Sequence, residues 1–107
     1  MKKLRKFRDS LTEDLKDRGY AQTYLSVALE QYENDKDINA FLAALKDVAQ
    51  AQGGLTKLAE KTQLNRQNLY KALSSHGNPR FDTLETVLHG LGYRLSIEHL
   101  TDYNRVA

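Results

Sequence analysis

Apolar residues recur along most of the chain at spacings of three and four, which place side chains on one face of an α-helix. Two long stripes lead the pattern: Ala21, Tyr24, Leu25, Ala28, Leu29 and Tyr32, then Ile38, Phe41, Leu42, Leu45, Val48 and Ala49. Three shorter ones follow: Leu55, Leu58 and Ala59; Leu69, Ala72 and Leu73; Phe81, Leu84, Val87, Leu88 and Leu91. The pattern predicts an all-α protein with five or six helices.

Capping and breaking residues set the expected helix boundaries. The tetrapeptide Ser10-Leu11-Thr12-Glu13 matches a capping box and predicts a short helix from there to about Arg18, stopped by Gly19. Asp37 and Asn65 suit the N-cap position of later helices. Glycines end two others, at Gly53-Gly54 and at Gly90 or Gly92. The basic start, from Lys2 to Arg8, is expected to be an unstructured solubilising end rather than an arm that contacts phosphates.

Only Tyr93 to Glu98 alternates apolar and polar residues, which is the period of a half-exposed β-strand. A lone strand cannot satisfy its own backbone groups, so it needs a partner strand. Because the chain shows no other strand-like segment, we expect the same strand of a second subunit to pair with it. The candidate dimer contacts are Tyr93, Leu95 and Ile97.

Composition narrows the class of protein. With 107 residues, 40% of them hydrophobic, the chain supports one modest core. It has no cysteine and no long apolar run, which fits a cytoplasmic protein without disulfides or membrane spans. The three histidines, His76, His89 and His99, match no metal motif, and no nucleophile–base pair suggests itself. We therefore expect no enzyme, no metal and no cofactor.

The segment LTKLAEKTQLNRQNLYKAL, residues 55–73, predicts two short helices joined by a three-residue corner. Ala59 is small where the helices would cross, and Leu58, Leu64, Leu69 and Ala72 have the offsets of inward positions. A generic helical hairpin with a solvated face is the simpler interpretation. However, residues 61–81 contain four bases and no acid, although the net charge is only +2. This distribution favours a helix-turn-helix that reads DNA. Gln63 occupies the turn position that is most often glycine, at a strain of about 1 kcal/mol.

The second helix offers residue types that read base edges, because Arg and Lys bond guanine while Asn and Gln bond adenine. Our candidate base contacts are Arg66, Gln67, Asn68 and Lys71. Other polar residues around them would hold the phosphate backbone, which sets register rather than sequence. These candidates are Thr56, Asn65, Tyr70, Ser74 and Arg80.

Five stretches of the chain resemble a known family: YLSVALE, ALKDVAQAQGG, LAEKTQLNRQNLYKALS, GNPRFDTL and VLHGLGYRL. They run from about Tyr24 to Leu95 and are similar to Xre-type helix-turn-helix proteins, more narrowly to the addiction-module antidote group of HigA-like antitoxins. The resemblance implies a lambda-repressor-like helix-turn-helix domain with a short C-terminal β-strand. It also implies a type II antitoxin from a bacterium or phage, which neutralises a RelE/ParE-like toxin and represses its own operon.

Such toxins are small and basic, and the chain has an acidic run that could meet one. The candidate toxin contacts are Glu30, Glu33, Asp35 and Asp37, although the same residues equally suit a solvated loop. We divide the chain into an N-terminal helical arm, 1–36, for toxin binding or dimerisation, and a DNA-binding domain, 37–107. The expected partners are operator DNA, the toxin and a second copy of the chain. The alternative is a stand-alone Xre-type repressor with no toxin.

Overall fold

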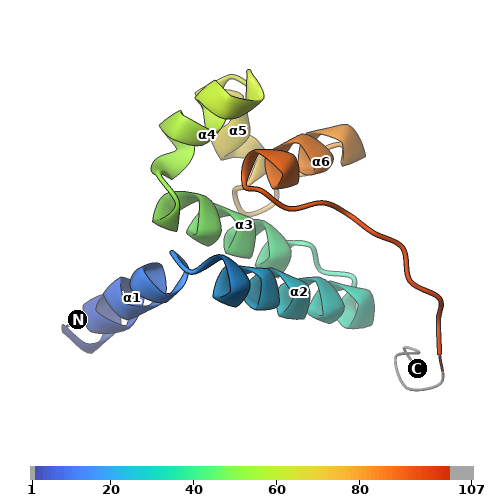
Figure 1. Ribbon diagram of the computed structural model, residues 1–107, viewed down its shortest axis with the longest axis horizontal. Coiled ribbons are helices and arrows are strands. Elements are labelled where there is room, and N and C mark those ends of the chain that lie inside the picture. The colour runs from blue at the N-terminus through green and yellow to red at the C-terminus, as the bar shows by residue number, and fades with distance from the viewer. Residues whose placement is uncertain (1, 102–107) are drawn as a thin grey trace.

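The computed structural model describes residues 2–101 as six α-helices (Figure 1). They are α1 (Lys2–Asp14), α2 (Arg18–Asp35), α3 (Asn39–Ala51), α4 (Gly54–Thr62), α5 (Arg66–Ala72) and α6 (Phe81–Gly90). Helix α3 lies in the middle, with α2 along one side and α4 to α6 grouped on the other (Figure 1). The prediction of an all-α fold is confirmed for these residues.

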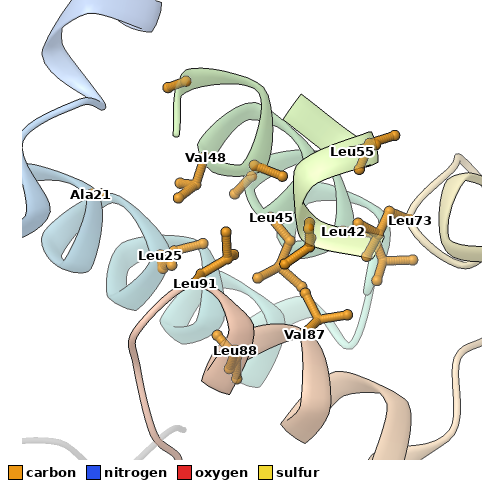
Figure 2. Close-up of a cluster of buried hydrophobic side chains, with 14 of the residues drawn as sticks. Ala21, Leu25, Leu42, Leu45, Val48, Leu55, Leu73, Val87, Leu88 and Leu91 are labelled. Atoms are coloured by element: carbon orange, nitrogen blue, oxygen red, sulfur yellow. The ribbon is translucent and has the colours of Figure 1, made fainter. Parts of the chain in front are cut away.

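The core is assembled around α3, whose predicted apolar stripe is buried almost throughout. Leu42, Leu45 and Val48 are completely inaccessible to solvent (Figure 2). Every other helix contributes to the same cluster or to its edge; the buried contributors outside α3 are Leu15, Ala21, Leu25, Leu55, Leu58, Leu69, Leu73, Val87, Leu88 and Leu91. Burial of this kind is the main force that orders short helices, which are marginal in isolation.

The start of the chain differs from its prediction in two ways. Helix α1 begins at Lys2, so Ser10 lies inside it and caps nothing, and the stretch from Lys2 to Arg8 is helical rather than unstructured. Gly19 lies in the first turn of α2, which is capped by Asp17 through a 2.9 Å bond from the Tyr20 amide. A capping box is a local signal, and here tertiary packing decides the boundary.

That packing places α1 against α3. Leu15, just beyond α1, is fully buried, and the Arg8 guanidinium lies 3.0 Å from the Asp47 carboxylate of α3. The other oxygen of Asp47 accepts a 2.9 Å hydrogen bond from the Tyr24 hydroxyl of α2. One carboxylate therefore ties three helices together.

The Tyr24 hydroxyl gives a pH signature. Burial, and then the hydrogen bond to the negative Asp47, raise the pKa of Tyr24 from 10.0 to about 12. Because the folded-state pKa lies above the unfolded one, this contribution to stability is complete below pH 10 and is lost as the pH rises through about 12. We expect the free energy of unfolding to fall more steeply over this window in the wild type than in Tyr24→Phe.

Urea unfolding at fixed pH steps, with absorbance at 295 nm to follow tyrosinate, measures both effects. Tyr20→Phe is the matched control, because Tyr20 is 48% exposed on the same helix. Identical pH slopes for the wild type and Tyr24→Phe would contradict the proposed role of the Tyr24–Asp47 hydrogen bond.

Two further expectations need correction at the C-terminal side. Phe81 was expected inside but is 70% exposed, because it is the first residue of α6 and its side chain lies beyond the turn that packs. Residues 93–101 form no strand, and within residues 2–101 no strand is present to pair with them. The predicted end of the last helix is confirmed, since α6 ends at Gly90 and Gly92 adopts a φ of 94°.

Candidate nucleic-acid interface

Helices α4 and α5 meet at a corner formed by Gln63, Leu64 and Asn65. The Thr62 hydroxyl donates a 2.8 Å hydrogen bond back to the Leu58 carbonyl at the end of α4. Gln63 is left-handed, with a φ of 63°, so the chain reverses there despite the absence of glycine. The Asn65 side-chain oxygen accepts from the amides of Gln67 and Asn68 at 2.8 and 3.1 Å. The predicted cap at Asn65 is confirmed, and it fixes where α5 begins.

The left-handed residue at the corner gives a stability prediction. Glycine adopts positive φ without steric strain, so Gln63→Gly is expected to raise the free energy of unfolding by up to about 1 kcal/mol. The matched control is Gln22→Gly, at an exposed position inside α2, where glycine should lower it by about 1 kcal/mol. Urea unfolding of the two variants decides the matter. Equal losses would show that Gln63 makes contacts that outweigh its backbone strain.

The four candidate base contacts lie at exposed positions of α5. Leu69 is 1% exposed and faces the core, whereas Arg66, Gln67, Asn68 and Lys71 are all exposed. At 100° per residue, Gln67 and Lys71 lie opposite Leu69 and one turn apart, and Asn68 lies about 100° from Leu69, whereas Arg66 lies only about 60° from Leu69, on the other side. The side of α5 opposite Leu69 therefore carries Gln67, Lys71 and, at its edge, Asn68, while Arg66 lies on the side that contacts Thr56 of α4.

Arg66 is held by the neighbouring helix. Its Nε donates a 3.0 Å hydrogen bond to the Thr56 hydroxyl in the first turn of α4. The terminal guanidinium nitrogens have no partner among residues 2–101 and remain available to an acceptor outside the chain. Thr56 thus orients the arginine across the α4–α5 junction, a role that the sequence alone did not indicate.

Sequence reasoning also missed Lys46. Its ammonium group, on α3, lies 4.3 Å from the centre of the Tyr70 ring, and Tyr70 itself is 48% exposed on α5. This cation–π contact adds a third positive charge beside the exposed side of α5. The signal was invisible in the sequence because α3 and α5 are brought together only by the fold.

The remaining backbone candidates lie at the end of α5 and in the loop after it. Ser74 is partly buried, and its hydroxyl donates a 2.6 Å bond to the Tyr70 carbonyl, which leaves its lone pairs as acceptors. Arg80 is 85% exposed and lies 3.4 Å from the Asp82 carboxylate, so its charge is partly offset. The loop between them is pinned to α3 by a 2.9 Å bond from the His76 amide to the Asn39 side chain.

The acidic candidates separate into two pairs. The side chains of Asp35 and Asp37 are engaged in the turn between α2 and α3. They accept hydrogen bonds from the backbone amides of Asp37 and Asn39, at 2.9 and 3.0 Å respectively. Glu30 and Glu33 are exposed on α2 and line a groove of about 920 Å³ between α2 and residues 92–100. The structure brings the second pair, and not the first, together with the dimer candidates Tyr93 and Leu95, which line the same groove.

Neither a cluster of metal-ligating side chains nor a membrane-spanning helix is found in the described part of the chain. Residues 2–101 hold no group of three or more metal-ligating side chains. Among the same residues, no helix has the length and hydrophobicity needed to cross a membrane. The fold and its surfaces define a small helical protein that presents one polar, basic helix and one acidic groove.

Comparisons with known proteins identify the family to which the chain belongs. The model of a family described as "Probable addiction module antidote protein" matches residues 3–99, so the chain belongs to that family. A protein of Haemophilus influenzae, described only as "Uncharacterized protein", is 32% identical over 93 residues, which cover 82% of this chain and 95% of the relative. No solved structure matches the chain.

Proposed function

We propose that the protein is the antitoxin of a type II toxin–antitoxin system, that it neutralises a RelE/ParE-like toxin and that it represses its own operon by binding operator DNA. The observation that carries the proposal is the membership of an antidote family, which extends over residues 3–99. An antidote needs a toxin to act on. We place its action in the bacterial cytoplasm.

Operator binding is supported by the α4–α5 corner, which we interpret as an Xre-type helix-turn-helix. Helix α5 would enter the major groove, where each base pair presents a distinct pattern of donors and acceptors. Arg66, Gln67 and Lys71, with Asn68 beside them, would contact base edges. The backbone contacts would come from Thr56, Asn65, Tyr70, Ser74 and Arg80. Asn65 uses its oxygen for the cap, so only its side-chain amino group remains free for a phosphate.

Toxin binding is assigned to the arm, residues 1–36. Within it, Glu30 and Glu33 have the exposure that a contact with a basic toxin requires, whereas Asp35 and Asp37 are engaged in the turn. Reversal of Glu30 and Glu33 to lysine is therefore expected to weaken toxin binding more than reversal of Asp35 and Asp37. The second double variant serves as the charge-matched control.

A homodimer would complete the DNA-binding unit. Two copies of α5 about 34 Å apart would contact successive major grooves and predict a palindromic operator. A stand-alone repressor without a toxin is the alternative, and the polar face of α5 would serve it equally. Neither function requires catalysis by this chain.

Growth assays test the proposal. The adjacent gene for a small basic protein is expressed alone or together with this chain, and colony counts are compared. We expect growth arrest in the first case and recovery in the second. Gel shift with the upstream region of the operon tests the DNA component separately. Binding to DNA without any effect on growth would favour the stand-alone repressor.

A further inference from the structure

The segment that follows α6 is anchored to the helical domain by hydrogen bonds of Tyr93. The Tyr93 amide bonds the Leu88 carbonyl at 2.8 Å, and its hydroxyl donates to the Arg18 carbonyl at 2.9 Å. We call residues 94–100 the C-terminal segment; it runs extended past α2 (Figure 1). Within residues 2–101 the C-terminal segment makes no backbone–backbone hydrogen bond.

This segment also exposes apolar side chains that would ordinarily be covered. Ile97 is 99% exposed, Leu100 is 60% exposed and Leu95 is 37% exposed. Most of the segment, including Arg94, Leu95, Ser96 and Glu98, lines the groove beside α2, whereas Ile97 does not and is almost fully open to solvent. An extended edge with free backbone groups and apolar side chains is a template for another strand.

The sequence around Ser96 is complementary to itself when it is paired antiparallel. A two-fold axis at Ser96 places Arg94 of one copy opposite Glu98 of the other, and Leu95 opposite Ile97. Directly opposed residues in an antiparallel pair lie about 4.5–5.5 Å apart, where opposite charges and apolar pairs stabilise the sheet. A shift of one residue would put the axis beside Ser96 and place Arg94 opposite Ile97 or His99.

We propose that a second copy of this chain pairs with the C-terminal segment as an antiparallel strand, with the two-fold axis at Ser96. The inference rests on the homodimer put forward above and adds its register. Because side chains alternate across a strand, two Arg94–Glu98 pairs then lie on one face of the paired strands, and Leu95 and Ile97 of both copies lie on the other face. Because Tyr93 anchors the start of the segment to the helices, this pairing also sets the orientation of the two helical domains relative to each other.

Cysteine crosslinking tests the register, since the natural chain has no cysteine. Ser96→Cys, Arg94→Cys and Glu98→Cys are prepared in the full chain and oxidised without DNA or toxin. A disulfide needs Cα atoms within about 7 Å. Residue 96 meets this limit across the axis, whereas residues 94 or 98 of the two copies lie about 13 Å apart or more. We expect covalent dimer from Ser96→Cys and little from the other two.

Charge reversal tests the pairing by an independent measurement. Arg94→Glu and Glu98→Arg each place two like-charged pairs across the interface, and each is expected to raise the dimer dissociation constant about 2- to 30-fold. The double variant restores opposite charges and should recover most of the wild-type association by sedimentation.

The outcomes separate this inference from the proposed function. A wild-type dimer that crosslinks best at 94 or 98, or a double variant no better than the single ones, overturns the register and leaves a homodimer standing. A monomeric mass overturns both the register and the homodimer. Crosslinking and sedimentation use neither toxin nor operator, so a wrong register leaves toxin neutralisation and operator binding to be decided by the growth and gel-shift assays.

Discussion

Replacement of Leu45 by alanine is expected to lower the free energy of unfolding by about 2–5 kcal/mol. Leu45 is completely buried at the centre of α3, among side chains from the helices on both sides of it (Figure 2). The truncation removes apolar contacts and leaves a cavity that the surrounding helices fill only in part. Since the free energy of unfolding of a small domain is only about 5–15 kcal/mol, this variant is expected to lose a large share of its stability.

Urea unfolding followed by circular dichroism measures this loss. Val27→Ala is the matched control, because Val27 is 57% exposed on α2 and its truncation should change stability by less than about 0.5 kcal/mol. Similar midpoints for the two variants would contradict the central position that the structure gives to α3.

Replacement of Arg66 by alanine is expected to weaken operator binding by about 1–3 kcal/mol, roughly 5- to 150-fold, if the arginine bonds a guanine. Its Nε is already bonded to Thr56, so the terminal nitrogens are directed before DNA arrives and less side-chain entropy is lost on binding. Removal of a base contact should also relax specificity, so binding to a scrambled operator should change little.

Two further variants make the Arg66 measurement specific. Thr56→Val keeps the arginine but removes its support, and should give a smaller loss on the operator than Arg66→Ala. Arg18→Ala removes an exposed arginine of α2 and should leave operator binding nearly unchanged. Titration of both DNA sequences at a fixed salt concentration is required, because phosphate contacts are salt-dependent. Equal weakening on both sequences would make Arg66 a phosphate contact.

Much of the helical fold could be predicted because its signals are local and agree with one another. The cap at Asn65 and the end of α6 at Gly90 each combine periodicity with a capping or breaking residue, whereas α3 was predicted by its stripe alone, since its N-cap is Ile38 and not the predicted Asp37. The start of α1 could not be predicted in this way. Ser10 carries a correct local motif, but Leu15 and the Arg8–Asp47 ion pair decide where the helix packs.

The candidate interface was predictable in its residue types but not in its contacts. The exposure of Gln67 and Lys71 follows from helical geometry once Leu69 is known to face inward, whereas that of Arg66, about 60° from Leu69, does not. The bond between Arg66 and Thr56, and the position of Lys46 over Tyr70, depend on how α3, α4 and α5 meet. The C-terminal strand was predicted from alternation, a pattern that describes what a segment can pair with rather than whether a partner is present.

Co-purification is the most direct test of whether this chain binds and neutralises a toxin. The chain is tagged and expressed with its native flanking DNA. The masses of the tagged chain and of the proteins that co-purify with it are then measured by intact mass spectrometry. We expect a small basic protein, encoded by the adjacent gene and toxic when expressed alone, to co-purify in a stoichiometric amount. Recovery of the tagged chain with itself only would contradict the antitoxin function and leave an autonomous DNA-binding repressor.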